Sequence, residues 1–481
     1  MYFEQFYLTC LAHASYMIAS EGVAAVVDPQ RDVEIYLDEA KKHGFQIRFV
    51  IETHLHADFV SGHRELASRT GAQIYIGARA GAKFPHTPVK EGDELRFGRA
   101  ALRFLETPGH TPEGMCVLVT DLERSPEPWA VLTGDTLFIG DVGRPDLSPE
   151  FTPQELAGMM HDSLHGKLLA LPDSVEVFPA HGAGSLCGRN ISPERRSTIG
   201  KERQFNYALR PMSRDAFVHL LTSDLPDRPE YFALDAEINR SGAPALSDLP
   251  EIPGLTPAQV QAKQAEGAIV LDTRPAAQFG AAHLPGAVNI GLGGQYASWA
   301  ASLIGLARPI VLVAEDPERL DESRMRLARV GVERVAGHLA GGVLAWEQAG
   351  LALDSVPQIS VHELHRELGE SPGQVQLLDV RRKMEWDAGH IGAARHRPLD
   401  AMRLHAGESP EIGAESVAGL DPANPVFVHC KSGYRSSIAT SLLQRAGFKN
   451  VVNVVGGFDA WLAQKFPAVA PEQPACATPA R

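Results

Sequence analysis

The chain has 481 residues, which is enough for about three domains. Charged residues make up 22% of it and apolar residues 44%, as in ordinary globular proteins. Its net charge of −14 at pH 7 argues against nucleic acid and anionic membranes as partners.

The expected location is the cytoplasm. The N-terminal segment MYFEQFYLTC has no basic region followed by an apolar one, so no signal peptide is predicted. No uninterrupted apolar run is long enough to span a bilayer. Five cysteines without the regular spacing of a disulfide framework indicate a reducing compartment.

The N-terminal half alternates short apolar runs with helical patterns. The segment VAAVVDP (23–29) predicts a strand. The next segment (32–44) predicts a helix with Asp32 as its N-cap and Gly44 as its stop. Between residues 241 and 257, four prolines and the lack of periodicity predict a linker.

Four strand-like runs of this half each end in a potential metal ligand. The runs RFVIETH, LRFLETPGH, WAVLTGD and VEVFPAH end at His54, His110, Asp135 and His181. Ligands at the ends of adjacent strands can converge at one edge of a sheet. Because His54 also opens a His-x-His-x-Asp pattern with His56 and Asp58, the sequence predicts a metal site.

The motifs THLHADF, TPGHTPEG and TGDTLF resemble those of the metallo-β-lactamase fold, an αββα sandwich of the α/β class. The resemblance covers a predicted first domain at residues 1–245. Hydrolases of this fold, such as glyoxalase II, fill two metal sites. The residues that match the first site are His54, His56, His110 and Asp135. The second site needs Asp58, a histidine where this chain has Phe59, Asp135 and His181.

Phe59 has no donor atom, so the second site lacks one ligand. The branch that the chain resembles is the persulfide dioxygenases, which hold one iron with ligands matching His54, His110 and Asp135. Two histidines and one carboxylate are the ligand set of non-haem Fe(II) oxygenases, whereas four-coordinate Zn²⁺ suits hydrolysis. The resemblance implies one Fe(II) per chain, although Phe59 alone does not specify iron. Three neighbours would orient the ligands or take protons, namely His56, Asp58 and His181.

Two residues near these motifs have two interpretations each. Arg144, in GDVGRPDL, either binds a substrate carboxylate, as a similar arginine does for glutathione in the family, or forms a salt bridge with Asp146. Cys187, in HGAGSLCGRN, either relays sulfur near the metal or is an inert buried thiol.

The C-terminal half contains an internal repeat of an α/β unit of about a hundred residues. LDTRPAAQFGAAHLPGA (271–287) matches LDVRRKMEWDAGHIGAA (378–394), and GGVLAW (341–346) matches GGFDAW (456–461). After the second copy, residues 469–481 predict a disordered tail.

The second copy, residues 358–468, carries a candidate nucleophile. Cys430 ends a predicted strand, and a helix is predicted to begin near Ser436. The loop after the cysteine consists of Lys431, Ser432, Gly433, Tyr434 and Arg435. Its N–H groups and the positive end of the helix would favour the thiolate. The loop, with LDVR upstream and GGFDAW downstream, resembles that of the rhodanese sulfurtransferases. The resemblance implies Cys430 and Arg435 as catalytic residues and the other loop residues as substrate-binding.

The first copy, residues 256–355, lacks this nucleophile. Aligning Pro309 with Pro425 puts Ala314 at the position of Cys430, followed by EDPERL in place of KSGYRS. The acidic loop would repel an anionic persulfide. This copy is predicted to be a degenerate rhodanese domain that serves for spacing, docking or dimer contact.

Together these features predict two coupled sulfur reactions, in a role such as sulfide detoxification. The iron domain would oxidise a low-molecular-weight persulfide with O₂ to sulfite and a thiol. Cys430 would pass sulfane sulfur between a persulfide and an acceptor, which gives thiosulfate when the acceptor is sulfite. The alternatives are a zinc thioester hydrolase of the glyoxalase II kind with a rhodanese appendage, or a sulfur carrier or scaffold without activity. The carrier thiol, the direction of transfer and the oligomeric state, a homo-oligomer included, stay open.

Overall fold

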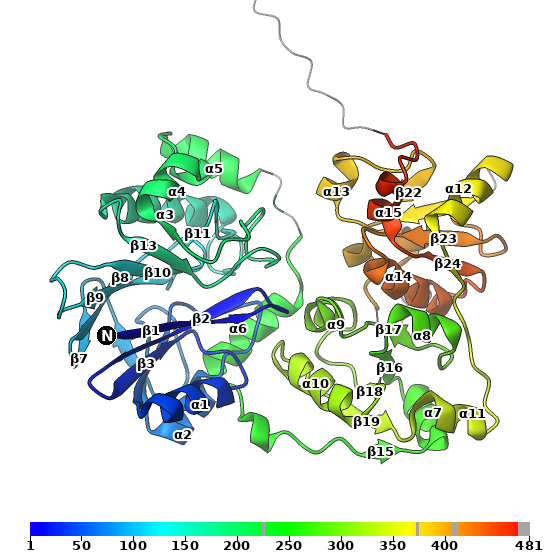
Figure 1. The fold of residues 1–481 in the computed structure, drawn as a ribbon, viewed down its shortest axis with the longest axis horizontal. Coiled ribbons are helices and arrows are strands. Elements are labelled where there is room, and N and C mark those ends of the chain that lie inside the picture. The colour runs from blue at the N-terminus through cyan, green and yellow to red at the C-terminus, as the bar shows by residue number, and fades with distance from the viewer. Residues whose placement is uncertain (224, 226, 372–374, 406–411, 470–481) are drawn as a thin grey trace, which may run out of the picture. The chain divides into compact units, whose positions relative to one another are not determined.

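The computed structural model describes residues 1–223, 225, 227–371, 375–405 and 412–469. The chain divides into two compact units, Met1–Pro250 with Leu327–Gly331, and Glu251–Arg326 with Val332–Arg481 (Figure 1). The predicted disordered tail lies outside the described residues except for Val469. The domain limits drawn from the sequence stay predictions. No helix among the described residues is both long and apolar enough to cross a membrane.

Two six-stranded sheets form the centre of the first unit (Figure 1). The first sheet contains, in spatial order, β1 (Tyr2–Leu8), β2 (His13–Ser20), β3 (Val23–Val27), β4 (Gln46–Glu52), β5 (Gln73–Gly77) and β6 (Thr87–Val89). The second contains β14 (Ser197–Thr198), β13 (Glu176–Pro179), β10 (Ala130–Gly134), β9 (Met115–Asp121), β8 (Ala100–Glu106) and β7 (Glu94–Phe97). A separate ribbon pairs β11 (Leu137–Phe138) with β12 (Asp141–Val142).

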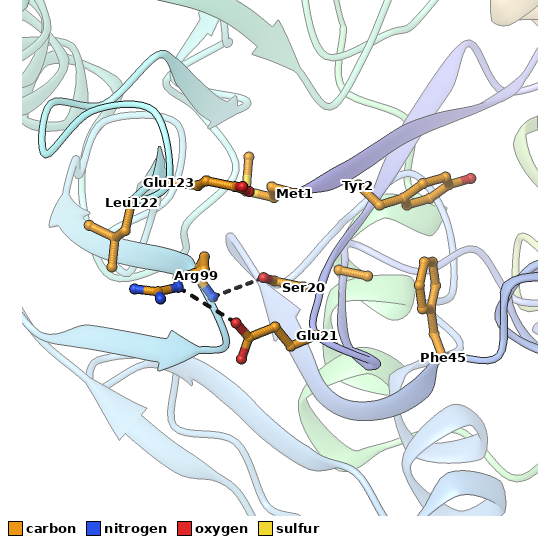
Figure 2. Close-up of a pocket in the computed structure, with 9 residues that line it drawn as sticks. Met1, Tyr2, Ser20, Glu21, Phe45, Arg99, Leu122 and Glu123 are labelled. Atoms are coloured by element: carbon orange, nitrogen blue, oxygen red, sulfur yellow. Dashed lines mark hydrogen bonds and ion pairs between the residues drawn. The ribbon is translucent and has the colours of Figure 1, made fainter.

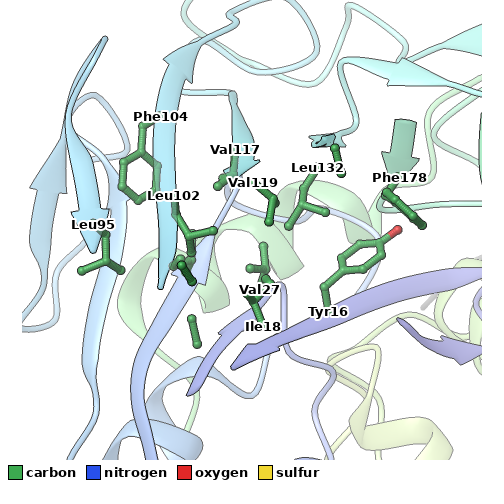
Figure 3. Close-up of a cluster of buried hydrophobic side chains, with 14 of the residues drawn as sticks. Tyr16, Ile18, Val27, Leu95, Leu102, Phe104, Val117, Val119, Leu132 and Phe178 are labelled. Carbon is green, nitrogen blue, oxygen red and sulfur yellow. The ribbon is translucent and has the colours of Figure 1, made fainter. Parts of the chain in front are cut away.

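The core of this unit lies between the two sheets (Figure 3). Tyr16 and Ile18, two residues apart on β2, point to the same face and are buried against Leu102 and Val117 of the second sheet. Burying a side chain of this size contributes roughly 1.5–3 kcal/mol. The core therefore fixes the two sheets, and with them the ends of the strands that carry the candidate ligands.

Helices cover the outer face of each sheet. Against the first sheet lie α1 (Glu34–His43) and α2 (His63–Thr70). Against the second lie α3 (Pro153–Gly166), α4 (Ile199–Phe205) and α5 (Arg214–Thr222), and α6 (Tyr231–Ser241) ends this part of the chain. The predicted α/β class and the αββα sandwich are confirmed.

The predicted N-cap of the first helix is wrong by one residue. Helix α1 begins at Glu34, and Val33 is the N-cap without a side-chain hydrogen bond. The Asp32 carboxylate instead accepts a hydrogen bond from Gln30 Nε2 at 3.1 Å, so it does not cap the helix. The predicted stop is confirmed, since Gly44 has a φ of 70°, a left-handed conformation that favours glycine.

The second unit contains two five-stranded parallel sheets of the same topology. The first has the order β15 (Gly254–Leu255), β19 (Val335–Leu339), β18 (Ile310–Val313), β16 (Ile269–Asp272) and β17 (Val288–Asn289). The second has the order β20 (Gln358–Ile359), β24 (Val451–Val454), β23 (Val426–His429), β21 (Gln376–Asp379) and β22 (Ala394–His396). The identical strand orders confirm the repeat predicted from the sequence.

Each copy adds helices around its sheet (Figure 1). The first copy has α7 (Pro257–Ala265), α8 (Ala276–Ala281), α9 (Tyr296–Leu303), α10 (Pro317–Ala328) and α11 (Gly342–Gln348). The second has α12 (Val361–Glu370), α13 (Lys383–Asp387), α14 (Tyr434–Arg445) and α15 (Gly457–Ala463). The pair β18–α10 in the first copy corresponds to β23–α14 in the second.

Candidate metal centre and nucleophile loop

The structure brings His54, His110 and Asp135 together. His54 follows the end of β4, His110 follows β8, and Asp135 directly follows β10. All three are buried, and one donor atom from each lies within 4.8 Å of the others. Asp135 Oδ2 is 3.8 Å from His54 Nε2 and 3.3 Å from His110 Nε2.

The second ring nitrogen of each histidine holds the ring in place. His110 Nδ1 donates to the carbonyl oxygen of Arg144 at 2.9 Å. His54 Nδ1 lies 2.9 Å from Thr53 Oγ1, whose proton goes to Asp28 Oδ2, so the hydroxyl oxygen accepts from the histidine. Both Nε2 atoms are therefore left with a lone pair that faces Asp135.

These facing atoms fit a metal ion. Among the described residues, none makes a hydrogen bond to His54 Nε2, His110 Nε2 or either carboxylate oxygen of Asp135. Burial, reinforced by neighbouring histidines, places the pKa of His54 well below its usual range, and burial also lowers the pKa of His110. Neutral imidazoles beside a carboxylate are a donor set that a divalent cation satisfies.

A second group of donors contains His56, Asp58 and His181, again within 4.8 Å of one another. His181 Nε2 is 3.4 Å from Asp58 Oδ2. Burial lowers the pKa of His181, but Asp135 and Asp58 outweigh it and raise the pKa to about 9. The ring of Phe59 lies 4.4 Å from that of His56 and 6.4 Å from that of His181, so an apolar ring stands beside this group.

His13 is a site residue that the sequence analysis missed. It begins β2, and its ring centre lies 4.1 Å from Phe59, 5.5 Å from His181 and 5.8 Å from His56. It is fully buried, and no described residue makes a hydrogen bond to either of its ring nitrogens. No sequence signal marks it, since it is far from the metal-binding motif and begins rather than ends its strand.

Two acidic residues beside His56 were also missed. His56 Nε2 lies 3.2 Å from Asp28 Oδ1 and 3.4 Å from Glu52 Oε2, which turns Nδ1 toward the donor groups. Burial lowers the pKa of His56, and the charge of Asp28 outweighs it and raises the pKa. The runs VAAVVDP and RFVIETH both place an acid at a strand end, so the pattern used for the ligands could have found them.

Arg144 forms the predicted loop salt bridge. Its guanidinium contacts Asp146 through two hydrogen bonds of 2.7 and 2.8 Å, and its carbonyl orients His110. A substrate carboxylate would have to compete with Asp146.

Cys187 is buried, and its sulfur lies within 4.8 Å of donor atoms of Asp135 and His181. Burial and the charges of Asp58 and Asp135 raise the pKa of the Cys187 thiol well above its usual range.

Cys430 follows the end of β23 and is only 1% exposed. The backbone N–H of Gly433 donates to its sulfur at 3.1 Å, and Ser436 Oγ lies 3.6 Å away. Helix α14 begins at Tyr434, two residues earlier than predicted, with Gly433 as N-cap at a φ of 106°. The sulfur thus lies in front of the first turn of this helix, as predicted.

Arg435 pairs with a carboxylate of the neighbouring helix. Its guanidinium makes two hydrogen bonds, of 2.6 and 2.7 Å, to the carboxylate of Glu385 on α13. Burial lowers the pKa of Arg435, and Glu385 outweighs it and raises the pKa. Arg435 therefore ties α13 to the loop, and its catalytic role stays a prediction.

The corresponding turn of the first copy is looser. In the active copy, a Cβ on Gly457 would lie 2.3 Å from the carbonyl oxygen of Cys430 and 2.8 Å from Lys431. In the first copy, a Cβ on Gly342 would lie 3.9 Å from the carbonyl oxygen of Ala314, its nearest neighbour. The position of Ala314 agrees with the sequence alignment, because it directly follows β18 as Cys430 follows β23.

Comparison with known proteins agrees with this architecture. The model of the metallo-beta-lactamase superfamily matches residues 8–181, and the model of the rhodanese-like domain matches 256–349 and 360–464. Over 223 residues the chain is 30% identical to the mitochondrial persulfide dioxygenase ETHE1 of Homo sapiens, which covers 45% of this chain and 78% of that protein. The chain belongs to the metallo-β-lactamase superfamily. Two rhodanese-like domains follow its metallo-β-lactamase domain, so the predicted fusion is confirmed.

The chain is also similar to a curated hydrolase and to a solved structure. A hydroxyacylglutathione hydrolase of Methylobacillus flagellatus is 30% identical over 226 residues, which is 47% of this chain and 80% of that protein. A crystal structure of a metallo-beta-lactamase from Staphylococcus aureus subsp. aureus COL has a TM-score of 0.64 and 31% identity, covering 70% of this chain and 98% of that one. The match to the Bos taurus ETHE1 spans 64% of that relative's length.

A cavity of about 610 Å³ in the metallo-β-lactamase domain is unrelated to these donors (Figure 2). Met1, Tyr2 and Phe45 line it, together with Arg99, which contacts Glu21 at 3.6 Å. None of the predicted site residues lines this cavity, and its wall also contains the polar side chains of Ser20 and Glu123.

Proposed function

We propose that the metallo-β-lactamase domain is a persulfide dioxygenase with one Fe(II), coupled to a sulfurtransferase in the last rhodanese domain. The observation that carries the proposal is the buried group His54, His110 and Asp135, two neutral imidazoles whose Nε2 atoms, like the carboxylate oxygens, receive no hydrogen bond from another described residue. Similarity to persulfide dioxygenase ETHE1 supports it. The reaction consumes RSSH, O₂ and H₂O and gives RSH, SO₃²⁻ and two protons.

The bound iron would supply the redox chemistry that joins O₂ to the terminal sulfur. The protein orients the metal ligands and fills one side of the site. The carbonyl of Arg144 and the hydroxyl of Thr53 fix the two imidazoles, and the rings of Phe59 and His13 fill the side where a hydrolase would hold a second metal. His181 and Asp58 lie beside Asp135, where they can hold a proton from the substrate.

In the last domain Cys430 would carry the sulfane sulfur as a persulfide. Sulfite attacks the outer sulfur, thiosulfate leaves, and the Cys430 thiolate is restored. The N–H of Gly433 stabilises that thiolate. The first copy has Ala314 in place of the cysteine, so mass spectrometry after incubation with thiosulfate should find no persulfide on residues 256–355.

Oxygen uptake with glutathione persulfide tests the first activity. The wild-type protein should consume O₂, release sulfite and contain one iron per chain. Asp135→Ala should abolish uptake and lower the iron content, because the carboxylate that would hold the iron is lost. Two tightly bound zinc ions per chain, purified from iron-sufficient cells, would contradict the proposal.

A zinc-dependent thioester hydrolase is the second candidate. The similarity to a hydroxyacylglutathione hydrolase favours it. The group His56, Asp58 and His181 could hold a second ion if another ligand replaced the missing histidine. Hydrolysis of a hydroxyacylglutathione by zinc-loaded protein, without O₂ uptake by the iron-loaded protein, would establish this function instead.

The proposed partners are small molecules: a thiol persulfide, O₂, sulfite and thiosulfate. A cytoplasmic location is proposed as well. The four described cysteines, Cys10, Cys116, Cys187 and Cys430, are free, which suits a reducing compartment.

A further inference from the structure

Helix α14, whose first turn faces the Cys430 sulfur, is buried on every side. Eight consecutive residues of it, 436–443, are buried, and four of them are serine or threonine. A helix that covers a sheet normally leaves one face to the solvent. This helix packs with one face on β23 and β24 of its own copy and with another on β17 and α8 of the degenerate copy (Figure 1). The helix that follows the nucleophile therefore lies between the two copies.

Hydrogen bonds run along the face of α14 that meets the degenerate copy. Asn289 of β17 accepts from Ser437 Oγ at 2.6 Å and donates its N–H to Ser441 Oγ at 3.0 Å. Nearer the end of the helix, His283 Nε2 lies 3.0 Å from Gln444 Oε1. Residues three and four apart share one face of a helix. On this face the contacts come from Tyr434, Ser437, Ser441 and Gln444.

Tyr434 makes the contact at the end of the helix that faces the sulfur. Its Oη donates to the carbonyl oxygen of Gly291 at 2.8 Å. Burial raises the pKa of Tyr434 above its usual range, so the phenol keeps its proton and remains a donor. A Cβ on Gly294 would lie 2.6 Å from the Tyr434 ring, so the loop of residues 291–294 packs closely against this side chain.

Helix α10 of the degenerate copy holds the loop of residues 291–294. Arg326, which is 7% exposed, donates to the carbonyl oxygens of Leu292 and Gly294 at 2.5 and 2.7 Å. It also donates to Glu322 Oε1, one turn earlier on α10, at 3.1 Å. Because α10 corresponds to α14 in the repeat, the degenerate copy uses its equivalent of the nucleophile helix to support the loop that binds Tyr434.

Gly433 connects this contact to the sulfur. Its N–H donates to Cys430 Sγ at 3.1 Å, and its φ is 106°. Because glycine has no side chain that packing could hold, the direction of this N–H depends on the residues on either side. Ser432 on one side is exposed, whereas Tyr434 on the other side is bound to the degenerate copy.

We propose that the degenerate rhodanese domain positions the Cys430 sulfur: its loop of residues 291–294 fixes Tyr434, and Tyr434 fixes the Gly433 N–H that binds the sulfur. Tyr434 is then a positioning residue, and the degenerate domain is a necessary part of the active loop's surroundings. The proposal rests on the sulfurtransferase role proposed for Cys430.

Two adjacent glycines of this loop provide the first test. Neither Gly293 nor Gly294 has a positive φ, so alanine strains neither backbone. A Cβ on Gly293 meets no atom within 4 Å, whereas a Cβ on Gly294 meets the Tyr434 ring. With thiosulfate as the donor, Gly294→Ala should lower the maximal rate of persulfide formation on Cys430 at least about tenfold, the effect of one charge-assisted hydrogen bond. Gly293→Ala should keep the wild-type rate.

The dependence on donor concentration separates positioning from binding. The thiosulfate concentration that gives half the maximal rate should stay the same in Gly294→Ala, because no group that would touch the donor is changed. Rapid quenching of the full chain followed by mass spectrometry of Cys430 measures both quantities.

Tyr434→Phe is the second variant, because it removes the hydroxyl and keeps the ring. It should slow persulfide formation in the same way. Adding Gly294→Ala to it should cost much less than in the wild type, since both changes act on one contact. Gln444→Met is the matched control at the far end of the same face of α14, and it should keep the wild-type rate.

Hydrogen exchange measures the position of the loop without the chemistry. The peptide that contains Gly433 should exchange faster in Gly294→Ala and Tyr434→Phe than in Gly293→Ala and Gln444→Met. Equal exchange and equal maximal rates in the two glycine variants, or a Gln444→Met variant as slow as Tyr434→Phe, would overturn the proposed positioning. A wild-type Cys430 that takes sulfur from no donor would instead overturn the sulfurtransferase role, and hydrogen exchange would still decide on the positioning.

Discussion

Phe59 places a ring without a donor atom beside His56 and His181. Its ring packs against those of His13 and His56, next to the unpaired donors of Asp58 and His181. An imidazole in its place would restore the donor that a second site needs.

Phe59→His should therefore raise the metal content. After loading with Zn²⁺ and desalting, elemental analysis should give two ions per chain for this variant and one for the wild type. Phe59→Leu is the control, since it changes the shape of the residue without adding a donor. One ion per chain in Phe59→His would show that His13 or the loop backbone, rather than the missing donor, closes the second site.

The ion pair between Glu385 and Arg435 should make the stability of the fold depend on pH. Burial raises the pKa of Glu385, but the hydrogen bonds and charge of Arg435 outweigh it and lower the pKa below its ordinary 4.5. A carboxyl with a lowered folded pKa stabilises the fold above its unfolded pKa, and this stabilisation is lost as the pH falls through the folded value.

Protection of α13 and the Cys430 loop against hydrogen exchange should accordingly fall below about pH 4.5. The loss should be smaller in Glu385→Gln, which cannot titrate. Glu370→Gln, an exposed site in the same domain, should behave as the wild type. The same acid-dependent loss in Glu385→Gln would assign the effect to another group.

The candidate ligands could be predicted from the sequence because strand periodicity and strand ends are local properties. His54, His110 and Asp135 each follow an apolar run, and the sheet brings the ends together. His13 could not be predicted in this way, because only the pairing of β2 with its neighbours carries it to Phe59. The partner of Arg435 was missed for the same reason, since Glu385 is fifty positions away in the sequence.

At the scale of elements, the active loop depends on the turn that begins α15. Gly457 has a φ of 53° and no room for a Cβ beside Cys430, whereas Gly342 in the degenerate copy has a φ of 60° and ample room. Because both glycines have a positive φ, replacing either one with alanine should lower the stability of the fold by about 1 kcal/mol through backbone strain.

Gly457→Ala should therefore displace the Cys430 loop and slow persulfide formation by at least about tenfold, as expected for a misplaced nucleophile. Gly342→Ala should lose a similar amount of stability but retain transfer. Rapid quenching followed by mass spectrometry of Cys430 measures both rates. Equal rates in the two variants would mean that the loop does not depend on this contact.

Element boundaries were predicted less well than element types. Helix α14 begins at Tyr434 because Gly433 adopts a left-handed conformation, which a sequence pattern does not reveal. Helix α1 begins at Glu34, and the Asp32 carboxylate accepts hydrogen bonds from Gln30 and Arg329 instead of capping the helix. The start of α14 thus differs from the prediction by two residues and the N-cap of α1 by one.

At the scale of the whole molecule, the two proposed sites belong to separate units with separate cores. Cys430→Ser replaces a thiol with a hydroxyl that does not ionise near neutral pH, and leaves the metal ligands untouched. This variant should keep its iron and its O₂ uptake with a free persulfide, and it should release sulfite.

Conversion of that sulfite to thiosulfate should fall sharply in Cys430→Ser. Oxygen, sulfite and thiosulfate are followed together, with Cys187→Ser as the matched cysteine control. If Cys430→Ser stopped oxygen uptake from a free persulfide while iron remained bound, sulfur would have to pass through Cys430 on its way to the metal.

The burial of Cys430 also determines which reagents can reach it. With 1% of the residue exposed and its sulfur held by the Gly433 N–H, the resting thiol is shielded from bulky electrophiles. Once it carries a sulfane sulfur, the reactive atom stands one bond further out. A small linear nucleophile such as cyanide should remove the sulfane sulfur readily, whereas a bulky aromatic disulfide should modify the free thiol slowly. The burial of Cys430 should thus protect its free thiol from oxidation and leave the sulfane sulfur of its persulfide accessible.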